Sequence, residues 1–109
     1  MKDDIFSPEG TYVIQFDVFE VKMSHWIETP RIFRVADNQL LFDLRGDVWS
    51  AMRINWLSES RLELLVAKYP GRISCHLFLD LQTDRGAGTA DNDRFEGNLS
   101  GLENWVRQH

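Results

Sequence analysis

Apolar and polar residues alternate through residues 60–81 of this 109-residue chain, on both sides of the turn Tyr69-Pro70-Gly71-Arg72. The alternating apolar positions are Leu62, Leu64, Val66, Ile73, Cys75, Leu77, Leu79 and Leu81. A period of two is typical of a strand with one apolar face, so the two runs predict a β-hairpin. The turn also sets the register, which places Arg61 opposite Asp80 and Glu63 opposite Phe78.

The same period recurs in residues 11–23, but its phase changes within the run. Apolar side chains occupy even positions from Tyr12 to Val18 and odd positions from Phe19 to Met23. A flat strand of this length would measure about 43 Å, which is long for so small a domain. We therefore expect a β-bulge or a sharp bend at Val18-Phe19.

Residues 25–30 are predicted to be a connection, and residues 31–35 and 39–45 a second hairpin. A turn at Gly46-Asp47 then leads into a strand over residues 48–57. That last strand has large apolar groups on both of its sides. A sheet face open to water alternates more cleanly, so we expect another element to cover part of its second face.

A short helix is predicted over residues 99–108. Ser100 and Glu103 have the spacing of a capping box at its start. Its apolar residues form one stripe, consisting of Leu99, Leu102, Trp105 and Val106. A helix this short is not stable alone in water, so it should pack on the sheet, where it could cover Trp49 and Phe78.

The rest of the chain lacks an apolar period. Residues 1–9 are expected to be a tail, and residues 83–94, rich in Gly, Ala, Asp and Asn, a mobile loop before a short strand at Phe95-Glu96. The whole pattern predicts one mainly β domain over residues 1–109. We expect an antiparallel meander of six or seven strands, a small sandwich or half-open barrel, with one short C-terminal helix.

Composition restricts the partners. Lys and Arg number 12 against 17 Asp and Glu, and the net charge of −5 argues against nucleic acid as a partner. The N-terminus lacks the basic start of a secretory signal, and no run of about 18 apolar residues occurs, so we expect a cytoplasmic protein without a membrane partner. The single cysteine, Cys75, occupies an apolar strand position and should be a buried thiol.

Motifs for metal and phosphate binding fail on their spacing. Counted from Asp91, a calcium loop would need a ligand and then a glycine where the chain has Phe95 and Glu96. The cluster Gly86-Ala87-Gly88 lacks the third glycine of a dinucleotide fingerprint, so we expect these glycines to give a loop its flexibility. We therefore predict no metal and no cofactor.

Motifs for catalysis are similarly weak. Cys75 and His76 are neighbours on a strand and point to opposite faces, so they cannot share a zinc ion, and the same geometry argues against a nucleophilic pair. Carboxylates within strands leave acid–base catalysis open, although cross-strand pairing such as Arg61 with Asp80 is the simpler interpretation. The sequence favours a protein that is not an enzyme.

One surface is a candidate binding site, namely the second face of the last three predicted strands. Its residues are Trp49, Arg53, Asn55, Glu63, Tyr69, His76, Phe78 and Asp80. Aromatic and charged side chains mixed in this way are common in binding patches and ligand pockets. We expect a non-enzymatic protein-binding protein, one version being an acidic neutralising protein of the immunity type that masks a basic toxin or enzyme. The alternatives are a small-ligand carrier or minor enzyme with a pocket inside a curved sheet, and a homodimer.

Overall fold

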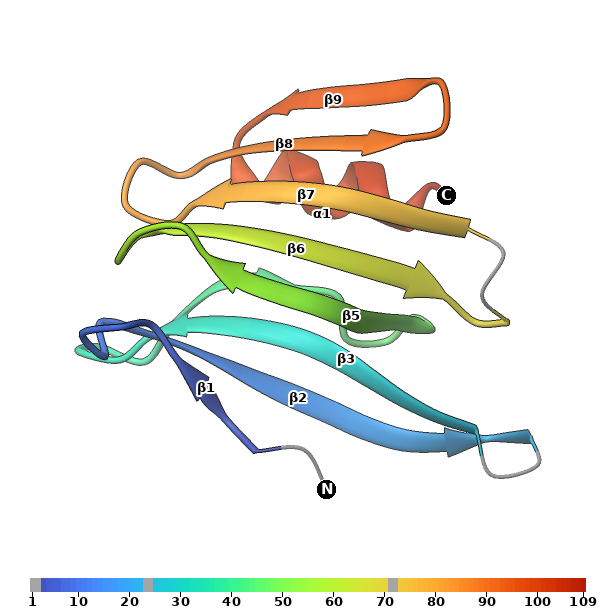
Figure 1. The fold of residues 1–109 in the computed structure, drawn as a ribbon, viewed down its shortest axis with the longest axis horizontal. Coiled ribbons are helices and arrows are strands. Elements are labelled where there is room, and N and C mark those ends of the chain that lie inside the picture. The colour runs from blue at the N-terminus through green and yellow to red at the C-terminus, as the bar shows by residue number, and fades with distance from the viewer. Residues whose placement is uncertain (1–2, 23–24, 71–72) are drawn as a thin grey trace.

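The computed structural model describes residues 3–22, 25–70 and 73–109, and in them it contains nine antiparallel strands and one helix (Figure 1). The first four strands are β1 (Ile5–Phe6), β2 (Tyr12–Val21), β3 (His25–Arg34) and β4 (Gln39–Asp43). The others are β5 (Trp49–Trp56), β6 (Arg61–Lys68), β7 (Ile73–Asp80), β8 (Arg85–Ala90) and β9 (Asp93–Gly97), and α1 spans Leu99–Arg107. The strands form two sheets in chain order, β1-β2-β3-β4 and β5-β6-β7-β8-β9, which confirms the predicted antiparallel meander, with nine strands where six or seven were expected.

The two sheets and the helix enclose the core. The sheets meet where β3 runs beside β5, and there the backbone N–H of Glu28 donates to Ser50 Oγ at 3.1 Å (Figure 1). Helix α1 lies behind β7 and β8 and reaches β4, where the Arg107 guanidinium donates to the carbonyls of Asp43 at 2.9 Å and Arg45 at 3.0 Å. The largest fully buried side chains include Ile14, Ile32, Phe42, Leu44, Trp49, Leu64, Leu77 and Leu102.

The predicted central hairpin is confirmed as β6 and β7. Arg61 lies opposite Asp80 and Glu63 opposite Phe78. Its apolar side chains are buried, with the exception of Ile73, which is 39% exposed at the start of β7. Gly71 and Arg72 of the predicted turn lie outside the described residues.

The predicted bulge at Val18-Phe19 is absent. β2 and β3 pair residue for residue, from Tyr12 opposite Arg34 to Val21 opposite His25, without a shift of register. The predicted connection over residues 25–30 is therefore wrong, because these residues are the first part of β3. Met23, the last residue of the predicted run, lies outside the described residues.

Twist of the β2–β3 ribbon accounts for the change of phase instead. At the base of the ribbon, Ile14 and Ile32 at even positions face the core. Near its tip, the ring of His25 at an odd position contacts Tyr69 at the end of β6, with a centroid distance of 5.5 Å. A ribbon of two strands can twist strongly and keep its register, so both faces of this one find partners.

β5 contains a bulge that the sequence did not predict. Its pairing with β6 shifts between Ala51 and Arg53, which makes Met52 the extra residue. Trp49 precedes the bulge and Trp56 follows it, yet both belong to the core or pack against it. The apolar groups on both sides of the predicted strand therefore come from this shift of phase, and not from a covering element.

Residues 85–97, most of which were predicted to be a mobile loop, form the β8–β9 hairpin; the short strand predicted at Phe95-Glu96 is part of β9. A Cβ atom on Gly88 would lie 2.5 Å from Trp105 Cζ3, and one on Gly86 would lie 2.8 Å from Leu102 Cδ2. These glycines therefore allow close approach of α1, and the expectation that they give a loop its flexibility was wrong. Since the helix needs small residues here, no apolar period marks the strand.

The two ends of the chain also refine the prediction. Within the predicted tail, Ile5–Phe6 forms β1 and pairs with β2. The predicted helix is confirmed, but its N-cap is Asn98, whose Oδ1 accepts from the Gly101 N–H at 2.7 Å, and not Ser100. No helix in the described part of the chain is long and apolar enough to cross a membrane.

Candidate functional site

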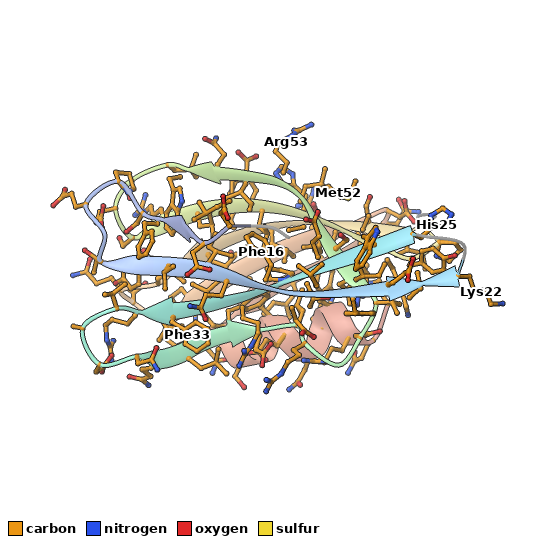
Figure 2. The ribbon with its side chains drawn as sticks, turned by 90° about the horizontal axis from the view of Figure 1, so that it is seen from below. Phe16, Lys22, His25, Phe33, Met52 and Arg53 are labelled. Carbon is orange, nitrogen blue, oxygen red and sulfur yellow. The ribbon has the colours of Figure 1, made fainter. Side chains whose placement is uncertain are left out.

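The candidate site lies on the face of the β5–β9 sheet that points away from α1. Paired residues of adjacent antiparallel strands lie side by side on one face, so the register defines rows of side chains, three of which make up the candidate site. The rows are Arg53, Leu65, His76, Thr89 and Arg94; then Asn55, Glu63, Phe78, Ala87 and Glu96; then Arg61, Asp80 and Arg85. These residues are termed the outer face. Met52 and Arg53 project from this side of the molecule, opposite the helix (Figure 2).

A polar network occupies the middle of the outer face. Glu63 Oε1 accepts from Asn55 Nδ2 at 3.1 Å, and Glu63 Oε2 lies 2.6 Å from His76 Nε2. The hydrogen bonds from Asn55 and His76 hold the pKa of the Glu63 carboxyl below its usual value, against the opposing effect of burial. The His76 ring packs on Phe78 with a centroid distance of 4.7 Å. The network thus fixes an aromatic surface that faces solvent.

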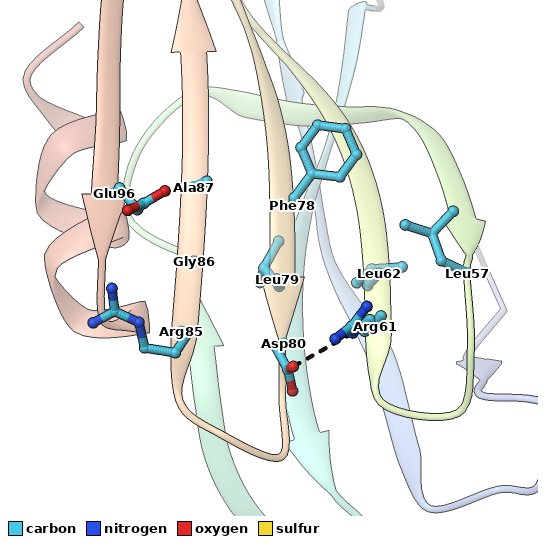
Figure 3. Close-up of a pocket in the computed structure, with 10 residues that line it drawn as sticks. All are labelled: Leu57, Arg61, Leu62, Phe78, Leu79, Asp80, Arg85, Gly86, Ala87 and Glu96. Carbon is cyan, nitrogen blue, oxygen red and sulfur yellow. Dashed lines mark ion pairs between the residues drawn. The ribbon is translucent and has the colours of Figure 1, made fainter.

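A depression of about 520 Å³ opens beside this network (Figure 3). Phe78 and Leu57 lie on one side of it, and Arg85 and Glu96 lie on the other. Between them is Ala87, the smallest side chain of the middle row. The depression is on the outside of the sheet, whereas the inside of the curve is filled by core side chains. It therefore differs from the expected pocket inside a curved sheet.

Cations outnumber anions on the outer face, which carries four arginines and three carboxylates. Two of the carboxylates have partners, because Asp80 Oδ2 lies 3.5 Å from Arg61 Nε and Glu63 is bound within the network. Arg85 and Arg94 are exposed and form no ion pair with any other described residue. The other residues of the chain carry eight Lys and Arg against fourteen Asp and Glu. The outer face is thus a cationic area on an acidic protein.

Trp49 does not belong to this surface, although the sequence placed it there. Its side chain is fully buried, and its Nε1 donates to Asp47 Oδ2 at 3.1 Å. The Lys68 ammonium lies 5.8 Å from the centroid of its ring. The bulge at Met52 separates Trp49 from the outward positions Arg53 and Asn55, so its inclusion was wrong.

The other predicted residues are divided between two places. Six of them lie on the outer face, namely Arg53, Asn55, Glu63, His76, Phe78 and Asp80. Tyr69 lies outside the rows and contacts His25 of the other sheet. Phe78 remains 42% exposed, so the expectation that α1 covers it was wrong. Sequence reasoning missed Leu57, Arg85, Ala87, Arg94 and Glu96. The last four lie in or just beyond the predicted loop. Arg85, Ala87 and Thr89 alternate there with the small residues Gly86, Gly88 and Ala90, and this alternation was the one available signal of a strand.

Burial and hydrogen bonding shift the pKa values of Cys75 and Glu63 in opposite directions. Desolvation raises the pKa of the Cys75 thiol to about 11, so this buried cysteine is unreactive at neutral pH. The lowered pKa of Glu63 is opposite to that of a general acid or base, which needs a pKa near the working pH. No group of three His, Cys, Asp or Glu ligands converges within the described ranges. The chain matches no protein-family model, no curated protein and no solved structure.

Proposed function

We propose that this protein is not an enzyme and that it binds another protein through the outer face of the β5–β9 sheet. The difference between the two faces of this one sheet carries the proposal. One face is buried against the core and α1, whereas the other exposes Phe78 at 42%, Leu57 at 52% and Met52 at 62%. Exposed aromatic and apolar groups among arginines are the usual composition of protein-binding patches.

A small-ligand carrier is the second candidate, and the depression beside Phe78 favours it. Its volume of about 520 Å³ lies within the usual range for ligand pockets. Such pockets, however, bury most of the ligand surface. A molecule on the outside of a sheet would keep one side in water, so the shape supports a protein partner more strongly.

A neutralising role of the immunity type is a narrower version of the proposal. The small size of the chain and its net charge of −5 are its only basis in the sequence. A basic toxin or enzyme would be attracted to the acidic remainder of the surface, and not to Arg85 and Arg94 on the outer face. The outer face therefore supports protein binding without supporting a basic partner.

Two truncations of equally exposed side chains test the proposal. Phe78→Ala changes the outer face, and Leu40→Ala changes a side chain of the other sheet that is 41% exposed, against 42% for Phe78. Parent and variants are immobilised and exposed to a lysate of the source cells. Phe78→Ala should retain less of the bound protein than the parent, and Leu40→Ala should retain as much. Both variants should have the same stability as the parent. Equal retention by the two variants would contradict the proposal.

Self-association provides a second test. Sedimentation over a range of concentrations should give the mass of a monomer for the parent protein. A dimer that Phe78→Ala dissociates would show that a second copy of the chain occupies the outer face, and it would exclude a foreign protein as the main partner.

A further inference from the structure

We infer that the partner presents an acidic segment, with an apolar side chain that enters the depression beside Phe78 and a carboxylate that pairs with Arg85. The inference rests on the proposed function, since it names the kind of protein that the outer face would bind. The unpaired arginines favour the acidic segment, and the depression favours the apolar side chain.

The charges favour an acidic segment because two arginines of the outer face, Arg85 and Arg94, have no ion-pair partner among the described residues. Arg85 borders the depression, Arg94 lies on the neighbouring strand, and neither forms an ion pair with another described residue. Guanidinium groups bind carboxylates in a bidentate geometry, which gives orientation as well as attraction. The acidic surface elsewhere repels such a segment, so the same charge distribution would steer it to the outer face.

The depression favours an apolar side chain next to that carboxylate. Ala87 leaves a gap in the middle row between Phe78 on β7 and Glu96 on β9. Leu57 completes the apolar wall and is 52% exposed. An inserted side chain would cover Phe78 and Leu57, which a small carboxylate bound to Arg85 alone would leave in water. A second copy of the chain is disfavoured, because two outer faces would bring unpaired arginines together.

A filling variant separates binding from folding. Ala87→Phe places a ring in the depression from an outward strand position, where aromatic residues are well tolerated. It should therefore block an incoming side chain and leave the core unchanged. Arg85→Glu reverses the charge at the rim, and Glu96→Gln removes the carboxylate on the outer face that has no partner among the described residues. Leu40→Ala on the other sheet is the matched control.

The experiment selects a displayed library of random linear peptides on the parent protein and then measures the affinity of the enriched sequences by fluorescence anisotropy. We expect sequences with an aliphatic or aromatic residue flanked by Asp and Glu, whose affinity falls as salt is added. Ala87→Phe and Arg85→Glu should each weaken binding at least about fivefold. Glu96→Gln should strengthen it, and Leu40→Ala should leave it unchanged.

The outcomes distinguish the inference from the proposed function. Neutral or basic peptides that Ala87→Phe displaces and Arg85→Glu does not affect would overturn the acidic partner and leave the outer face as a binding surface. Peptides whose affinity is unchanged by Ala87→Phe and by Phe78→Ala would overturn both the acidic partner and the outer face as a binding surface. Binding of simple carboxylates such as acetate or benzoate to Arg85 with the affinity of the peptides would replace the acidic segment by a small anion.

Discussion

The Glu59 carboxylate accepts a hydrogen bond from the Ser7 hydroxyl at 2.6 Å, across 52 positions of the sequence. The same carboxylate accepts from the backbone N–H groups of Glu9 at 2.6 Å and Thr11 at 2.9 Å. The Ser7 hydroxyl in turn accepts from the N–H of Tyr12 at 3.0 Å. One side chain between β5 and β6 therefore fastens the β1–β2 turn of the other sheet.

Replacing Glu59 by Gln should destabilise the protein at pH 7, and the loss of stability relative to the parent should become smaller as the pH falls. Burial would raise the pKa of the Glu59 carboxyl, but hydrogen bonds from Ser7, Thr11 and Glu9 lower it from 4.5 to about 2. Because the folded pKa is the lower one, the stabilisation is complete above about 4.5 and is lost as the pH falls towards about 2. Urea midpoints of parent and variant, measured between these limits, should converge.

Glu20→Gln is the control for this titration, because Glu20 is an exposed carboxylate on β2. Its urea midpoint should follow that of the parent at every pH. A difference between parent and Glu59→Gln that stays constant from pH 7 to about pH 2 would show that charge plays no part in the Glu59 contacts.

Gly88→Ala should lower the free energy of unfolding by about 1–3 kcal/mol, the usual cost of overpacking. The added Cβ would lie 2.5 Å from Trp105 Cζ3. The Trp105 ring cannot move freely, because its Nε1 donates to Asp93 Oδ2 at 3.1 Å and it stacks on Phe95 at 6.2 Å between centroids. Urea unfolding measures the effect, and Thr89→Ala on the outer face is the control. Equal stability of the two variants would refute the close contact.

Asn98→Ala should cost about 1 kcal/mol of stability, because it removes the side chain that caps α1. Ser100→Ala should change stability by less than about 0.5 kcal/mol, since Ser100 is an exposed residue of the first turn. Thermal or urea unfolding of the two variants decides between the caps. A larger loss for Ser100→Ala would support the capping box that the sequence predicts.

The sequence predicts a strand pair well when its apolar pattern and its turn residues indicate the same register. The β6–β7 hairpin has apolar residues at alternate positions from Leu62 to Val66 and from Ile73 to Leu79 and a Pro-Gly turn, so both its face and its register follow. The β8–β9 hairpin has Gly86, Gly88 and Ala90 at the inward positions. Their small size is set by the helix on the other side, and a pattern of hydrophobic residues cannot reveal it.

The residues of the site could be predicted only as far as the pairing register of the strands could be predicted. Glu63, His76 and Phe78 come together because the β6–β7 turn fixes which residues are opposite one another. The error at Trp49 has a different origin, since one inserted residue reverses every inward and outward assignment on one side of it. Ala51 pairs with Val66 and Arg53 with Leu65, which are neighbours on β6, and only the partner strand shows where the extra residue lies.

Deleting Met52 should leave the protein folded, with a small change of stability, because the residues on either side of it already pair with consecutive positions of β6. The shortened strand would alternate regularly, so Trp49 and Trp56 would keep their inward directions. Deleting Ser50 should instead turn Trp49 outward and bring Val48 into its place, at a cost of about 3–5 kcal/mol for the lost core contacts. Urea unfolding followed by tryptophan emission compares the two deletions. If deletion of Met52 is as damaging as deletion of Ser50, the bulge is needed to bend β5 towards β3, and it is not a tolerated insertion.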